Sequence, residues 1–193
     1  MALLFRAFTL LLLSTFLVTP SHAQRKKKNE EKIEIPQFNT DDAGAVFYKE
    51  VVDQAGTPQQ LFDKANIWFS SFYKSPSSVI KTRDKENGVI EGVGMFWLKN
   101  TDPKTGAKSN ASRIQYYITI KFRDGRYRFM INRIINKRQS KFPIKNWIDE
   151  QEKAYNARTA DFLVQTDTYF KEKLIPSLKA AMAATEKTGE EDW

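Results

Sequence analysis

Apolar and polar residues alternate through the middle of the chain, which is typical of β-strands with one buried face. The pattern predicts strands at residues 77–84, 89–98, 111–123 and 126–136. Short polar turns that end in glycine, Asn87-Gly88 and Asp124-Gly125, join these strands into two hairpins. Glycine favours such turns because it accepts the positive φ of a tight reversal. The polar residues 99–110 are expected to form the loop between the hairpins.

A strand and a helix are expected before these hairpins, and a longer helix after them. Residues 46–52 are rich in β-branched and aromatic side chains, which predicts the first strand. Thr57 and Gln60 have the spacing of a capping box, so a helix should begin directly after Thr57. Apolar residues at helical spacing over residues 147–184 predict a long C-terminal helix that Pro176 kinks or ends.

The turn at residues 124–125 also determines which residues face each other across the second hairpin. A two-residue turn places Arg123 opposite Arg126 and Lys121 opposite Arg128. The alternate residues are mostly apolar and must face the helices. This packed face is predicted to hold Ile114, Tyr116, Ile118, Ile120 and Phe122 from one strand and Tyr127, Phe129, Ile131 and Arg133 from its partner. The basic rows then lie on the other side of the sheet, here called the open face.

The strand at residues 89–98 adds an apolar patch to the open face. If Ile90 and the two glycines of this strand face the helices, the open face receives Val89, Glu91, Val93, Met95 and Trp97. Exposed apolar patches mark interaction surfaces or are covered by another part of the chain. The candidate covers are the arm at residues 33–38, a second copy of the chain, and a ligand. With the opposite register, the glycines would face outwards instead.

The N-terminal residues predict export. Arg6 precedes an apolar run at residues 10–18 that is too short to span a bilayer, and Ser21 and Ala23 are small residues of a signal-peptidase site. No second apolar stretch approaches membrane-spanning length, so no transmembrane segment is expected in the mature chain. The predicted organisation is a signal peptide at residues 1–23, a charged, partly disordered leader and arm at 24–43, a folded domain at 44–184 and a polar tail at 185–193.

Composition excludes several kinds of chemistry. The chain has no Cys, and its one His, His22, lies in the predicted signal peptide. The mature chain would therefore lack catalytic dyads and triads that use imidazole or thiol, as well as the ordinary zinc ligands. We expect no metal and no cofactor. Asp84, Glu86 and Glu91 leave a carboxylate-dependent hydrolase as an alternative, although no catalytic motif accompanies them.

Several blocks of the sequence resemble a known family. They are Phe47-Tyr48-Lys49-Glu50-Val51-Val52, Leu61-Phe62-Asp63-Lys64-Ala65-Asn66-Ile67-Trp68, Asp84-Lys85-Glu86-Asn87-Gly88 with Ile90-Glu91-Gly92-Val93-Gly94, and Tyr117-Ile118-Thr119-Ile120-Lys121-Phe122-Arg123-Asp124-Gly125-Arg126-Tyr127. They resemble exported proteins of Gram-negative bacteria described as a domain of unknown function with a TATA-box-binding-protein-like (TBP-like) fold. The resemblance implies an α+β domain of order β-α-β4-α, with a five-stranded antiparallel curved sheet and helices on one face. It also implies a place in the periplasm or at the cell surface. It does not imply DNA binding, because a fold does not determine a function, and no nucleic-acid partner is expected.

Charge supplies the hypothesis about function. Lys and Arg outnumber Asp and Glu by 31 to 23, giving a formal net charge of +8 that falls to +7 when Arg6 leaves with the signal peptide. Like charges directly opposite each other destabilise a strand pair, so the two basic rows need an explanation. One explanation is an anionic partner, which arginine forks bind well. The other is a solvated face that Glu50 or Glu91 neutralises.

The resulting prediction is an exported, non-catalytic binding or assembly module. Its partner is an anionic glycan, a lipid headgroup or an acidic protein. The predicted binding residues are Trp97, Arg113, Tyr117, Lys121, Arg123, Arg126 and Arg128. The alternatives are the hydrolase and a structural homodimer that pairs its open sheet faces.

Overall fold

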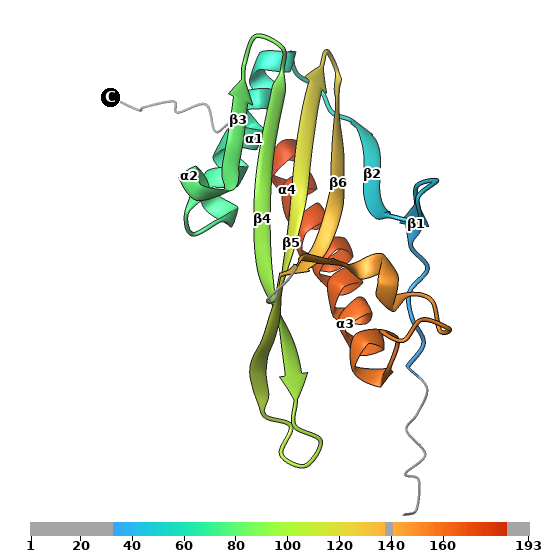
Figure 1. Cartoon of the computed structure of the whole chain (residues 1–193). Coiled ribbons are helices and arrows are strands. Elements are labelled where there is room, and N and C mark those ends of the chain that lie inside the picture. The colour runs from blue at the N-terminus through green and yellow to red at the C-terminus, as the bar shows by residue number, and fades with distance from the viewer. Residues whose placement is uncertain (1–32, 138–140, 185–193) are drawn as a thin grey trace, which may run out of the picture. The chain divides into compact units, whose positions relative to one another are not determined.

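A computed structural model of the chain describes residues 33–137 and 141–184. The predicted signal peptide, most of the charged leader and the polar tail lie outside the described residues. The elements are β1 (Asn39–Thr40), β2 (Val46–Asp53), α1 (Pro58–Phe72), α2 (Pro76–Val79), β3 (Ile80–Asp84), β4 (Val89–Thr101), β5 (Lys108–Arg123), β6 (Arg126–Lys137), β7 (Lys141–Pro143), η1 (Ile144–Trp147), α3 (Ala157–Thr168), η2 (Tyr169–Leu174) and α4 (Ile175–Ala183) (Figure 1).

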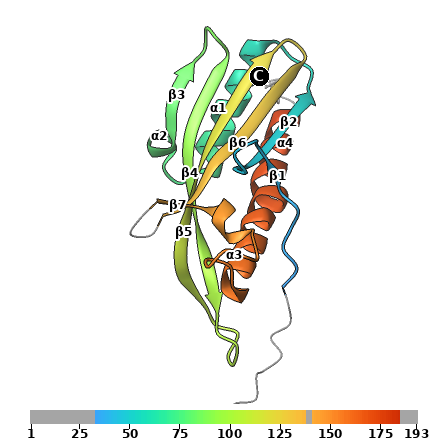
Figure 2. The same ribbon diagram turned by 45° about the vertical axis from the view of Figure 1, so that its right-hand side comes forward.

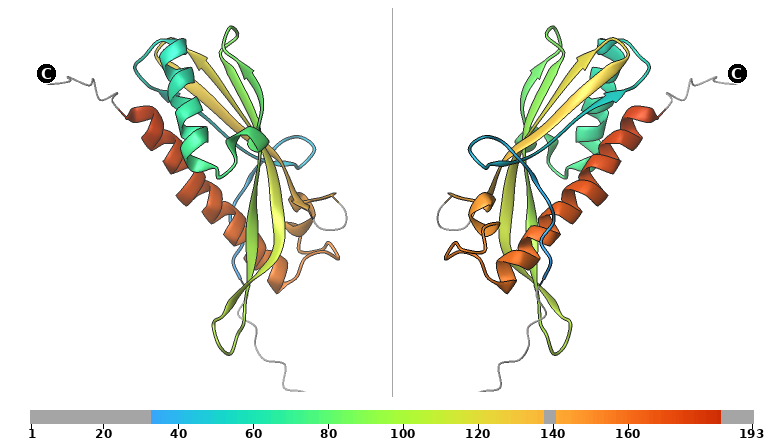
Figure 3. Two further views of the ribbon diagram at one scale, coloured as in Figure 1. Left: turned by 90° about the vertical axis from the view of Figure 1, so that its left-hand side faces the viewer. Right: turned by 90° about the vertical axis from the view of Figure 1, so that its right-hand side faces the viewer.

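The strands form one antiparallel sheet in the order β1-β2-β6-β5-β4-β3, with β7 paired to β6. The five long strands are those that the sequence predicts, and the short β1 and β7 bring the number to seven. The helices α1, α3 and α4 lie on one side of the sheet and leave the other side open (Figures 2 and 3). The α+β class and the expected arrangement of layers are therefore confirmed.

The core lies between this side of the sheet and the helices. Alternate residues of β5 and β6 point into it, and Ile118, Ile120 and Phe129 are at most 1% exposed. From the helices, Trp68 and Phe69 of α1 are buried to the same degree. Burial of this apolar surface is the main force that holds the helices on the sheet.

Helix α1 begins where the capping box predicts. The Thr57 side chain accepts a hydrogen bond from the Gln60 amide, and the Gln60 side chain accepts one from the Thr57 amide. Both contacts satisfy backbone donors that have no partner inside the helix. The predicted N-terminus of α1 is confirmed.

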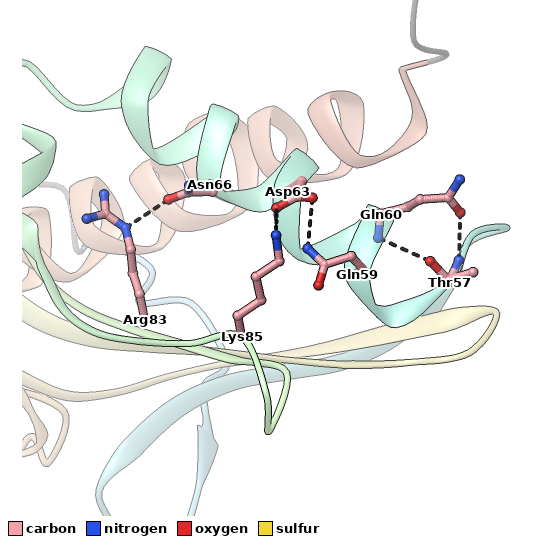
Figure 4. A network of polar contacts seen from close by, with 7 residues as sticks. All are labelled: Thr57, Gln59, Gln60, Asp63, Asn66, Arg83 and Lys85. Atoms are coloured by element: carbon pink, nitrogen blue, oxygen red, sulfur yellow. Dashed lines mark hydrogen bonds and ion pairs between the residues drawn. The ribbon is translucent and has the colours of Figure 1, made fainter.

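Polar contacts join the outer side of α1 to β3 and the turn that follows it (Figure 4). Lys85 forms an ion pair with Asp63 at 3.4 Å, and Arg83 Nε donates to Asn66 Oδ1 at 2.9 Å. These exposed contacts add little stability. They connect the helix to the edge of the sheet.

The first hairpin and the loop after it differ from the prediction at their ends. Residues 77–79 belong to the short helix α2, so β3 starts only at Ile80. Strands β4 and β5 continue into the segment expected to be a loop, and only residues 102–107 are left between them. Asp102 stabilises this tip, since its side chain accepts hydrogen bonds from the Lys104 and Thr105 amides. The resulting hairpin arm projects past the helices (Figure 1).

The C-terminal helix starts ten residues later than predicted and does not end at Pro176. Asn156 caps α3, and the preceding apolar residues Ile144 and Trp147 lie in the 3-10 turn η1. The π-helical turn η2 ends two residues before Pro176, and the Ile175 amide donates to the Phe170 carbonyl five residues back. This wider turn accommodates a proline, which lacks an N–H and crowds the carbonyl of the preceding turn.

Arg133 is not on the packed face, so its predicted position is wrong. Gln115 pairs with Ile135 and Tyr117 with Asn132, so two residues of β6 lie opposite one residue of β5. Arg133 takes a φ of +48°, and its side chain is exposed. This β-bulge shifts the alternation by one residue and brings Ile134 into the core in its place.

Candidate functional site

The basic rows lie on the open face in the predicted register. Arg123 pairs with Arg126 and Lys121 with Arg128, and all four side chains are exposed. Their neighbours along the strands, such as Phe122, are buried on the packed face. The register of the second hairpin is confirmed.

These four cations line one hollow of about 350 Å³ at the end of the sheet. Val51 and Tyr127 complete its lining. Gly125, with a φ of +70°, makes the tight turn that brings Arg123 and Arg126 together. Strand β2 forms the third side, because Val51 pairs with Arg128. We call this the basic hollow.

No carboxylate of the described residues forms an ion pair with the cations of the basic hollow. In the described part of the chain, none of its four cationic side chains forms an ion pair. Glu50 lies opposite Phe129 on the packed side, where it pairs with Lys179 of α4. Glu91 is on the open face, but its carboxylate accepts a hydrogen bond from Thr82 at 3.2 Å. The expected neutralisation by Glu50 is therefore wrong.

Asp53 is the acidic residue placed nearest by the strand pairing, since it lies opposite Arg126. No ion pair joins the two side chains among residues 33–137 and 141–184. The sequence did not identify Asp53 or Val51 as neighbours of the basic rows, because the pairing of β2 with β6 joins distant segments. Their alternation in β2 would place both on one face once that pairing is known.

The other predicted site residues lie farther along the open face. Arg113 pairs with Trp97, and its guanidinium carbon lies 5.2 Å from the centre of the indole ring. Lys121 lies eight positions after Arg113 in β5, which is about 27 Å along a strand. The seven predicted residues therefore share a face but do not form one site.

Tyr117 lies between these two ends, beside a second hollow of about 280 Å³ on the open face. Arg133 also lines this hollow, and its guanidinium carbon lies 5.1 Å from the centre of the Tyr117 ring. The bulge in β6 is what brings Arg133 to this side. Its position has no local signal in the sequence, because apolar Ile134 and Ile135 follow it directly.

The N-terminal arm at residues 33–38 does not cover the apolar patch of the open face. Ile35 and Phe38 pack against the buried core instead. Met95 and Trp97 remain 46% and 48% exposed. The prediction that residues 33–38 cover the patch is therefore wrong. Cover by a second copy of the chain or by a ligand stays a prediction.

Asp84, one of the carboxylates proposed for a hydrolase, has a structural role in the turn that follows β3. Asp84 accepts hydrogen bonds from the Asn87 side chain at 2.7 Å and from its amide at 2.9 Å, and these bonds lower the pKa of Asp84. A general acid needs a raised pKa, so Asp84 does not suit that role. Among the residues with described positions, no three His, Cys, Asp or Glu side chains come together as metal ligands.

The geometry defines a class of protein: an α+β domain with helices on one side of an antiparallel sheet and a basic hollow on the other. Residues 48–136 match the sequence profile of a family described as a domain of unknown function (DUF4468) with a TBP-like fold. The match confirms the resemblance for this part of the chain. No curated protein matches the chain.

Solved structures show the same fold. A DUF4468 family protein from Bacteroides ovatus is 18% identical with a TM-score of 0.59, and the match covers 79% of this chain and 92% of that one. A TBP-like protein from Parabacteroides distasonis is also 18% identical, with a TM-score of 0.58 and coverage of 78% and 99%. At this identity the likeness shows the fold alone. None of the helices described here is long and apolar enough to cross a membrane.

Proposed function

We propose that this domain is a non-catalytic binding module of an exported protein, and that the basic hollow binds an anionic group of its partner. One observation carries the proposal. Lys121, Arg123, Arg126 and Arg128 surround a single hollow, and none of them has a carboxylate partner among the described residues.

Electrostatics supports an anion at this position. Two like-charged pairs opposite each other in one hairpin cost a few tenths to about 1 kcal/mol each. An anion between the rows turns this repulsion into charge-assisted hydrogen bonds, and the arginine forks offer bidentate geometry to carboxylate, sulfate or phosphate.

The form of the site favours an anionic glycan over the other two partners. A hollow of about 350 Å³ lies in the size range of small-ligand sites. An acidic protein would need about 800 Å² of complementary surface on this side. A glycan chain presents single carboxylate or sulfate groups that enter such a hollow one at a time.

A second candidate is a homodimer formed through the open face. Trp97 and Met95 are about half exposed at the end away from the basic hollow, and aromatic and methionine side chains are enriched in interfaces. Such a dimer would pair this end of the sheet, because overlapping basic rows would repel each other.

Binding experiments on the mature chain separate these outcomes. The probes are heparin as a sulfated glycan, phosphatidylglycerol vesicles and a poly-glutamate peptide. We expect binding to heparin that weakens as salt increases. Tighter binding to the vesicles or the peptide would identify one of the other two partners, and light scattering would reveal a dimer.

A double charge reversal tests the site itself. Arg126→Glu with Arg128→Glu should weaken heparin binding tenfold or more and leave the thermal midpoint unchanged or slightly raised. Lys104→Glu with Lys108→Glu is the matched control, since it changes the charge equally on the hairpin arm. Equal binding by both double variants, or no binding of any probe by the wild type, would refute the proposal.

A further inference from the structure

Another hollow lies on the opposite side of the sheet from the basic hollow, among β6, β7, η1 and the start of α3. It measures about 320 Å³, and three aromatic residues, Phe142, Trp147 and Phe162, form much of its wall. The Phe142 and Trp147 rings are nearly parallel, at 28° with centres 6.2 Å apart. The centres of the Trp147 and Phe162 rings lie 6.0 Å apart. We call it the aromatic hollow.

Asn136 lines this hollow and is the polar residue that points to a ligand. It is 5% exposed, and its side-chain oxygen Oδ1 has no hydrogen-bond partner among the described residues. Ser112, a diagonal neighbour on the same face of the sheet, is 4% exposed, and its hydroxyl also lacks a partner there. Buried polar atoms in native proteins are nearly always hydrogen-bonded. The Asn136 oxygen therefore calls for a donor from outside the described chain.

Arg158 closes one side of the aromatic hollow and is held in place. Its guanidinium carbon lies 5.5 Å from the centre of the Phe162 ring. Its Nε and Nη2 atoms donate to Asn100 Oδ1 at 3.1 and 2.9 Å. The N-terminus of α3 is also occupied, because the Asn156 side chain accepts from the Thr159 amide at 3.1 Å. The positive groups nearest the hollow thus already have partners.

We propose that the aromatic hollow binds one neutral sugar ring. An unpartnered carbonyl oxygen requires a donor, which a sugar hydroxyl supplies and a carboxylate or phosphate does not. The C–H face of a sugar ring packs against aromatic walls, and of the three aromatic residues Phe142 is the one that is only partly buried. The volume of the hollow lies at the small end of ligand sites, which fits a single ring. The inference is independent of the basic hollow, since the two sites lie on opposite faces of the sheet.

Nuclear magnetic resonance titration of the whole mature chain tests this proposal. The probes are glucose, galactose and N-acetylglucosamine, with glucuronate and a short acidic peptide for comparison. We expect one of the neutral sugars to shift the indole signal of Trp147 and the carboxamide signals of Asn136 at millimolar concentration. A response to glucuronate or to the peptide alone, or no response to any probe, would overturn the proposal.

Variants of Asn136 and Arg158 test whether these residues contribute to sugar binding. Asn136→Leu removes the unpartnered oxygen, so we expect binding at least tenfold weaker with an unchanged or higher thermal midpoint. Arg158→Gln changes an exposed residue, so the fold is retained, and it should weaken binding several-fold. Asn110→Ala on the hairpin arm is the control and should bind like the wild type. Unchanged sugar affinity in Arg158→Gln and in a folded Asn136→Leu would overturn the assignment.

Discussion

The two faces of the sheet differ in how their polar and charged groups are paired. On the packed face, four of the five buried tyrosine hydroxyls have partners, and only that of Tyr127 has none among the described residues. The Tyr116 hydroxyl lies 2.8 Å from that of Tyr73 and 3.2 Å from that of Tyr169. Tyr48 donates to Asp167 at 2.9 Å, and Lys171 neutralises the same carboxylate. On the open face, the cations of the basic hollow stand opposite one another without carboxylate partners in the described structure. The packed face therefore supplies stability, and the open face carries a cost that binding would offset.

Alkaline pH should have the largest effect, and it acts through the packed face. Burial raises the pKa of Tyr127 from 10.0 to about 12, with a smaller contribution from Glu50, and burial also raises the pKa of Tyr48, Tyr73, Tyr116 and Tyr169. Because these pKa values are higher in the folded state, their stabilisation is complete below about pH 10 and is lost as the pH rises. The loss from Tyr127 alone reaches about 2 kcal/mol by pH 12.

We expect cooperative unfolding between about pH 10 and 12, measured by near-ultraviolet circular dichroism together with phenolate absorbance. All five tyrosines should ionise with the unfolding transition. Complete ionisation near pH 10 in a chain that keeps its near-ultraviolet spectrum would show that the packed face does not exclude water.

Gly94→Ala should have the next largest effect. A Cβ at Gly94 would overlap the ring of Tyr116, which is 0% exposed and held by two hydroxyl contacts. Overpacking of this kind costs about 3 kcal/mol, or a fall of about 10 °C in the thermal midpoint. Met95→Ala on the adjacent position of β4 is the control, because that side chain is on the open face. A similar loss in both variants would contradict the contrast between the faces.

Tyr116→Phe isolates the hydrogen bonds of the packed face. The ring stays, while the hydroxyl that contacts Tyr73 and Tyr169 is lost. Removing such a buried partner costs about 1–2 kcal/mol. Urea unfolding should show the loss as a lower midpoint with an unchanged slope. An unchanged midpoint would mean that the tyrosine contacts add nothing to stability.

Local signals in the sequence predict much of this fold. The two-residue turn at Gly125 determined the register of the second hairpin, and the capping box at Thr57 placed the start of α1. The bulge at Arg133 was missed because two isoleucines follow it and conceal the change of phase. The predicted start of the C-terminal helix at Trp147 was wrong, because α3 begins only at Ala157. Apolar residues of a 3-10 turn such as η1 resemble the first turn of an amphipathic helix.

Only the part of the candidate site that lies within the β5–β6 hairpin was predictable from the sequence. Lys121 and the three arginines lie in one hairpin, so their register follows from the turn. Val51 and Asp53 reach the same place through pairing of β2 with β6, which no local pattern specifies. Trp97 and Arg113 share the face, but alternation gives only the side of the sheet and not the distance along it.

In the proposed function, the basic rows destabilise the sheet slightly and bind an anionic group. Lys121→Glu tests this proposal directly, because it places a carboxylate opposite Arg128 while leaving the apolar surface unchanged. We predict a thermal midpoint about 1–3 °C higher than that of the wild type, and heparin binding about tenfold weaker. An unchanged or lower midpoint together with undiminished heparin binding would contradict the account.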